Sequence, residues 1–126
     1  MQTDALRDRV VLVVDDTSSF ARDLQESLEH AGATVSCTAL RDAPRAVGVW
    51  KVSIAIMDCH PPSRERRALI RRLRQDRVPF IFYSAQAPGD VTTERGAPFI
   101  EKPCPPEKMV AAVQYLLGRA WSPKSC

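Results

Sequence analysis

The chain has 126 residues, enough for one domain with its own core. Hydrophobic residues make up 44% and charged residues 26%, a composition typical of folded, soluble domains that excludes a disordered chain. No apolar run reaches the roughly 18 residues of a membrane helix, and residues 1–9 are too polar for a secretory signal. We therefore expect a single cytoplasmic domain over 1–126, with its core from about 9 to 121 and no membrane contact.

The net charge and the cysteines indicate little about partners. A net charge of +3 only weakly favours an acidic partner. The cysteines are too scattered for a disulfide framework or a zinc ribbon, and we expect them to be reduced thiols, with Cys37 in the core. They are Cys37, Cys59, Cys104 and Cys126.

The first half of the chain alternates apolar runs with helical patterns. Residues 9–14 form a β-branched run that is apolar on both faces, as in a central strand covered on both sides. Apolar residues at i, i+4 and i+8 from Phe20 predict an amphipathic helix that ends at Gly32. A strand is expected at 34–38. A helix is expected between 40 and 50, weakened by Pro44 and Gly48.

The second half repeats this alternation. Further strands are expected at 53–57, 78–83 and 97–101, and further helices begin near Pro61 and Pro106. The stretch 87–96 contains Pro88 and Gly89, so we expect mostly loop there, with the helix between the fourth and fifth strands shortened or missing.

This order of elements predicts an α/β fold with a doubly wound, five-stranded, mostly parallel sheet. Ligands of such sheets bind beyond the carboxyl ends of the strands, where the strand order switches. Four of the predicted strands deliver polar residues to that edge. These are Asp15 and Asp16, Asp58, Ser84, and Lys102.

The order and spacing of these residues resemble the receiver domains of bacterial two-component response regulators, the chemotaxis-type fold. The matching residues are 13–16, Asp58 with Pro62 four residues on, Ser84-Ala85, and Phe99 three residues before Lys102-Pro103. The resemblance implies a flavodoxin-like sheet of strand order 2-1-3-4-5. It also implies a cis peptide bond at Lys102-Pro103.

The resemblance implies that Asp58 is the phosphoacceptor of a phosphorelay and that Mg²⁺ is the cofactor. Asp16, Asp58 and the backbone carbonyl of His60 would ligate Mg²⁺ directly, and Asp15 through water. Clustered carboxylates need such a cation, because two charges about 4 Å apart repel by roughly 4 kcal/mol at an effective dielectric of 20. Mg²⁺ binds one or two carboxylates together with phosphate oxygens.

The other matched residues have implied roles in transfer and switching. Lys102 would neutralise charge on the phosphoryl group, and Ser84 would donate its hydroxyl to a phosphoryl oxygen. Phe99 would move with Ser84 as the switch. His60 and Gln86 occupy positions that tune the lifetime of the phosphoryl group. Considered one at a time, the matched residues are also of types that are common at helix caps, in turns, in cores and on surfaces.

The resemblance implies a stand-alone receiver that catalyses only its own phosphorylation and dephosphorylation and signals by protein contact. Its phosphodonor would be a sensor histidine kinase or a phosphotransfer protein. One alternative is a receiver-fold adaptor that is never phosphorylated. Another is a Mg²⁺-dependent phosphohydrolase of the haloacid dehalogenase type, but that family needs Asp-x-Asp and this chain has Asp15-Asp16-Thr17.

The segment 64–77 carries seven arginines. A charge run of this kind is usually the solvated face of a helix. An acidic protein partner and nucleic acid are the alternatives. No aromatic residue is interleaved with the arginines, so we expect no nucleic-acid binding.

Overall fold

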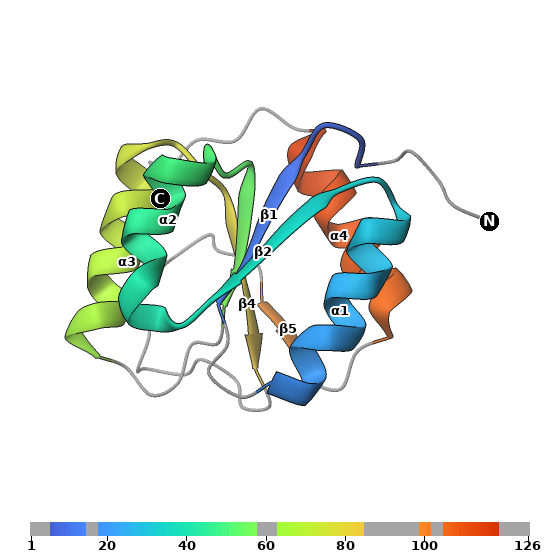
Figure 1. The fold of residues 1–126 in the computed structure, drawn as a ribbon, viewed down its shortest axis with the longest axis horizontal. Coiled ribbons are helices and arrows are strands. Elements are labelled where there is room, and N and C mark those ends of the chain that lie inside the picture. The colour runs from blue at the N-terminus through green and yellow to red at the C-terminus, as the bar shows by residue number, and fades with distance from the viewer. Residues whose placement is uncertain (1–5, 15–17, 58–62, 85–98, 102–104, 119–126) are drawn as a thin grey trace.

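The computed structural model describes residues 6–14, 18–57, 63–84, 99–101 and 105–118, and shows a sheet between two layers of helices (Figure 1). The strands are β1 (Val10–Val14), β2 (Thr34–Thr38), β3 (Ile54–Met57), β4 (Phe80–Ser84) and β5 (Phe99–Glu101). The helices are α1 (Ser18–His30), the 3₁₀ turn η1 (Leu40–Asp42), α2 (Ala43–Trp50), α3 (Arg64–Gln75) and α4 (Pro106–Leu117).

The five strands form one parallel sheet in the order β2-β1-β3-β4-β5, which confirms the predicted doubly wound fold. The first strand lies between the second and third, so the strand order reverses beside it. Near their carboxyl ends, Val14 of β1 pairs with Thr38 and with Met57, Met57 pairs with Phe82, and Ser84 pairs with Glu101. Neighbouring strands therefore end close to the same level.

Successive residues of each strand point into different cores. In β1, Val11 and Val13 belong to one apolar cluster, and Leu12 and Val14 belong to the other. The same alternation holds along β3 and β4. This is the period of two that a strand imposes on its side chains, and it explains why the central strands are apolar on both faces.

Each core is closed by its own pair of helices, as Figure 1 shows. The first core lies under α1 and α4 and the second under α2 and α3. The chain passes from β1 to β2 in one direction across the sheet, and from β2 through β3 to β4 in the other. Because crossovers are right-handed, that reversal places α1 on one face and α2 and α3 on the opposite face.

Helix α2 forms where the sequence predicts it, despite Pro44 and Gly48. Pro44 occupies the first turn, where its missing N–H would have no helical partner in any case. The helix ends at Trp50, and Lys51 continues with a φ of 51°, its N–H donating to the Val47 carbonyl. At Gly48, an added Cβ would lie 2.5 Å from an Nη atom of Arg72 on α3, so a larger residue there would displace the end of that side chain.

Helix α3 begins with a side-chain cap. Ser63 has extended backbone angles, and its Oγ accepts a hydrogen bond of 3.0 Å from the backbone N–H of Arg66. This satisfies one of the helix N–H groups that have no partner within the helix. Near the other end, Arg72 Nε donates to Asp76 Oδ2 at 3.0 Å.

Two residues differ from expectation. Cys37, expected in the core, is exposed, because β2 is an edge strand, and its Sγ lies 3.5 Å from Gln25 Oε1. Arg66, expected on a solvated face with the other arginines, is only 8% exposed. The predicted loop at 87–96 and the bond Lys102-Pro103 lie outside the described residues.

Strand β2 presents hydroxyl groups to the α2 layer. Thr34, Ser36 and Thr38 are register partners of Val10, Leu12 and Val14, which pack toward α2 and α3. Thr38 Oγ1 is buried and has no hydrogen-bond partner in the part of the chain that the structure describes. A buried polar group without a partner is costly, so we expect this hydroxyl to lower the stability of the fold.

None of the described helices combines the length and the apolar character that a bilayer span requires.

The Ser63 cap yields a first testable prediction. Replacement Ser63→Ala removes the acceptor for the Arg66 N–H and should lower the free energy of unfolding by about 1 kcal/mol. Urea denaturation followed by circular dichroism measures this change. Ser63→Asp retains an acceptor at the cap, so its stability should remain close to that of the original chain. An equal loss in both variants would contradict the capping role.

The buried hydroxyl of Thr38 yields a second. Thr38→Val keeps the β-branched shape and removes the unsatisfied group, so the free energy of unfolding should rise by about 1 kcal/mol. Thr34→Val is the control, because Thr34 is exposed on the same face of the same strand and should change stability by less than about 0.5 kcal/mol. Destabilisation by Thr38→Val would show that the hydroxyl does have a partner.

Candidate functional site

The candidate site is the edge of the sheet where the carboxyl ends of β1, β3, β4 and β5 lie side by side. Adjacent strands of a sheet are about 4.8 Å apart, so paired strand ends are near neighbours. Val14 and Met57 form such a pair, and Ser84 and Glu101 form another. This edge is also beside the reversal of strand order, where doubly wound sheets bind their ligands.

The strand ends at this edge are held by the core. Exposed fractions are 6% for Val14, 1% for Met57 and 2% for Phe82, and all three pack in the core under α2 and α3. Tyr83, which faces the other core, is 4% exposed. Such burial leaves the strand ends little freedom, which gives groups attached to them a fixed base.

The predicted site residues follow these strand ends in the sequence. Asp15 and Asp16 come directly after Val14, Asp58 after Met57, and Lys102 after Glu101. These four residues, together with His60 and Gln86, lie outside the described residues. Ser84 and Phe99 are placed as backbone positions only, in β4 and β5.

Two described residues near this edge were not singled out from the sequence. Thr38 ends β2 beside Val14, and its hydroxyl is buried without a partner in the described part of the chain. Arg66 is buried in the first turn of α3, the helix that starts after the segment following Asp58. Neither has a sequence signal of its own, because a threonine in a strand and an arginine in a run of arginines are both commonplace.

The described residues contain no group of three or more His, Cys, Asp or Glu side chains that could hold a metal ion. An open hollow of about 480 Å³ lies along the last turns of α1, lined by Glu26, Ser27, Glu29 and His30. That end of α1 leads into the start of β2, so the hollow is at the opposite edge of the sheet. The predicted magnesium ligands instead follow the carboxyl ends of β1 and β3 in the sequence.

The comparison with solved structures agrees with the topology. No protein-family model matches the chain, and no curated protein matches its sequence. The receiver domain of the TMAO respiratory system response regulator TorR is 26% identical, with a TM-score of 0.74 over 88% of this chain and 98% of that chain. A response regulator receiver protein from Burkholderia phymatum is 25% identical, with a TM-score of 0.72 over 90% and 98%.

A response regulator from Thermotoga maritima, 22% identical, shares the fold with a TM-score of 0.75 over 88% of this chain and 98% of that chain. These structures match nearly the whole chain. The strand order of the sheet is the one that the resemblance implies. The chain is therefore a receiver domain of the response-regulator type, the receiving module of two-component signalling.

Proposed function

We propose that this receiver accepts a phosphoryl group on Asp58 in a Mg²⁺-dependent reaction. The observation that supports this proposal is the meeting of four strand ends at one edge. Each of these strands either ends in or is followed directly by a residue with the chemistry that phosphoryl transfer needs. A structural sheet edge has no need of three carboxylates and a lysine in this order.

The transfer step places a covalent bond on the carboxylate of Asp58. One carboxylate oxygen attacks the phosphorus, and the bond from phosphorus to the donor atom breaks. The donor leaves with the electron pair of that bond, and Asp58 becomes an aspartyl-phosphate. Phosphoryl transfer depends mainly on positioning and on neutralising charge, so the buried strand end before Asp58 is a suitable support.

The donor set at this edge fits Mg²⁺. Carboxylate and carbonyl oxygens are its preferred protein ligands, and Asp15, Asp16, Asp58 and the carbonyl of His60 supply such oxygens. When bound, the ion would neutralise the negative charge of the phosphoryl oxygens and of the clustered carboxylates.

The remaining residues of the proposed site bind the aspartyl-phosphate and change conformation when it forms. Lys102 pairs its ammonium with a phosphoryl oxygen, and Ser84 donates its hydroxyl to another. The movement of Ser84 toward the phosphoryl group opens space for Phe99, which makes the pair a two-state switch. His60 and Gln86 flank the acyl phosphate and set how readily water reaches it.

The proposed partners follow from this chemistry. A phosphohistidine on a sensor kinase or a phosphotransfer protein is the donor, and the signal passes on through contact with a further protein. The receiver catalyses its own phosphorylation and dephosphorylation and no other reaction. We place this exchange in the cytoplasm.

The test is the intact mass of the protein after incubation with Mg²⁺ and a small acyl-phosphate donor. The original chain should gain the mass of one phosphoryl group, and Asp58→Asn should gain none. Chelation of Mg²⁺ should remove the gain. Asp8→Asn is the matched control, because this exposed carboxylate precedes the start of β1, at the opposite edge of the sheet, and the variant should gain the group normally.

A mass gain that persists in Asp58→Asn would assign the phosphoacceptor to another residue. A folded protein that gains no mass with any acyl-phosphate donor would instead be a receiver-fold adaptor that acts without phosphorylation.

A further inference from the structure

Four arginines form one row along the outer side of α3. Arg64, Arg67, Arg71 and Arg74 are spaced by three, four and three residues. Since each residue of a helix is turned by about 100°, the four fall within an arc of about 80° and extend about 15 Å along the axis. Arg64, Arg67 and Arg71 are exposed and Arg74 is half-buried. We call these four residues the arginine row.

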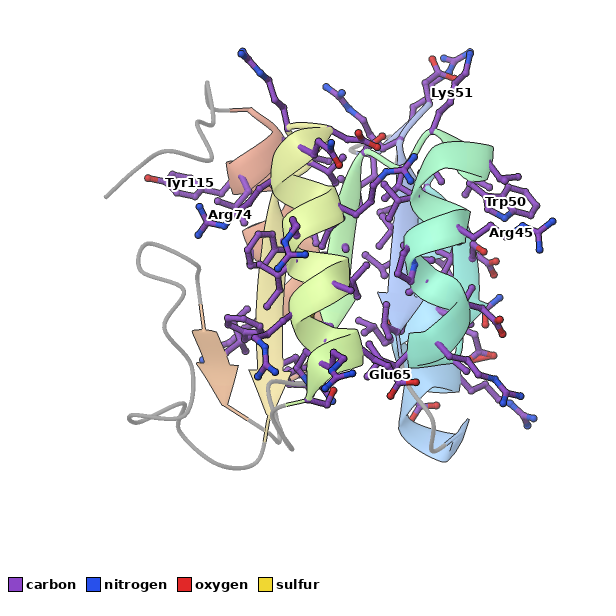
Figure 2. The ribbon with its side chains drawn as sticks, turned by 90° about the vertical axis from the view of Figure 1, so that its left-hand side faces the viewer. Arg45, Trp50, Lys51, Glu65, Arg74 and Tyr115 are labelled. Carbon is purple, nitrogen blue, oxygen red and sulfur yellow. The ribbon has the colours of Figure 1, made fainter. Side chains whose placement is uncertain are left out.

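The acidic residues of this helix and its cap lie on another side. By the same rotation, Glu65 and Asp76 are on the side of α3 that also carries Arg72, and Arg72 contacts Gly48 of α2. There Asp76 is already paired with Arg72. Figure 2 shows Glu65 at the beginning of α3 on the side toward α2, whereas Arg74 projects away from α2. No ion pair joins Arg64, Arg67 or Arg71 to another residue within the described ranges.

The positive charge is concentrated in this half of the molecule. Between Leu40 and Arg77 the sequence has ten Lys and Arg against four Asp and Glu, whereas the rest of the chain has eight against eleven. The mild net charge of +3 therefore conceals one strongly basic helical layer and a mildly acidic remainder.

The arginine row is unfavourable to the isolated helix. Like charges three and four residues apart repel, and Arg64 at the first position also opposes the positive end of the helix dipole. All seven basic residues between 64 and 77 are arginines. Lysine has nearly the same helix propensity, so propensity does not explain this choice. Arginine differs in its planar fork of donors, which binds carboxylates in pairs of hydrogen bonds.

We infer that the arginine row is a docking surface for an acidic helical segment of a partner protein. A helix that presents carboxylates at the same spacing would place one opposite each arginine and would relieve the repulsion along the row. The Debye length is about 8 Å at physiological salt, so only a ligand seated on the row gains this energy.

Nucleic acid fits the row less well. A duplex extends beyond 15 Å and would run past the row onto the rest of the molecule, where acidic residues nearly balance the basic ones. The outer side of α3 also carries Ala68 and, at its last position, Gln75, but it has no aromatic side chain on which bases could stack. The exposed Trp50 projects from the side of α2 that faces away from α3, so it is not part of this surface (Figure 2).

The test measures binding of a fluorescein-labelled helical peptide with glutamates at i, i+3, i+7 and i+10 on an alanine-rich background, at physiological salt. The double substitution Arg67→Glu and Arg71→Glu should weaken binding at least tenfold. Arg9→Glu with Lys108→Glu is the matched control, because it changes the net charge equally at exposed positions outside α3 and should change the affinity less than threefold.

Two further measurements separate docking of an acidic helix from binding by net charge alone and from binding of nucleic acid. A peptide of the same composition, with its glutamates distributed around the helix, should bind at least fivefold more weakly than the matched peptide. Equal affinity for both peptides, or an equal loss in the control variant, would overturn the proposal, since net charge alone would then explain binding. Tighter binding of a 20-base-pair DNA duplex than of the matched peptide would also overturn it.

Binding at the arginine row needs no phosphoryl group, so it can be separated from the function proposed for Asp58. The row variant should retain its circular dichroism spectrum and its mass gain from the acyl-phosphate donor. Loss of peptide binding with both properties kept supports the row as a separate surface. If the row variant loses both peptide binding and the folded spectrum, the double substitution Arg67→Gln and Arg71→Gln replaces it. This milder variant should also weaken binding. Unchanged binding in this variant, when it is folded, would overturn the proposal.

Discussion

The central strands carry large apolar side chains on both faces, so the sheet is stable only between two helical layers. Val13 and Leu12, adjacent in β1, are 2% and 0% exposed, although they point to opposite sides. In this chain the helices that cover the two faces are crossovers between strands, and such crossovers join parallel strands. Parallel strands bring their carboxyl ends to one edge. The position of the candidate site is therefore a consequence of how the core is buried.

The strands and helices could be predicted because their signals are local. Runs such as 10–14 and 54–57 contain no polar residue, and the spacing of Leu69, Ile70 and Leu73 fits one buried helix face. The exposure of Cys37 and the burial of Arg66 could not be predicted in this way. The first depends on which strand is at the edge of the sheet, and the second on what lies near the start of α3. These neighbours are set by the tertiary fold.

The candidate site was predictable to the level of the sheet edge. Strand ends are visible in the sequence, and parallel pairing places them together, as the pairs Val14–Met57 and Ser84–Glu101 bear out. The arrangement of the carboxylates and of Lys102 depends on segments beyond those ends and stays a prediction. Local pattern also missed the division of the charged side chains of α3. That division depends on which side of the helix meets α2, and the sequence alone does not specify this.

Within the described part of the chain, strand β2 ends the sheet, so one row of its backbone N–H and C=O groups has no neighbouring strand. Many proteins block such an edge with a lysine, a proline or a bulge, but the sequence Thr-Val-Ser-Cys-Thr has no charge and no proline. The edge is thus chemically open to an added strand. Two molecules meeting there could continue one sheet across both, so concentrated solutions of this protein should be checked for slow association before any dimer is interpreted as biological.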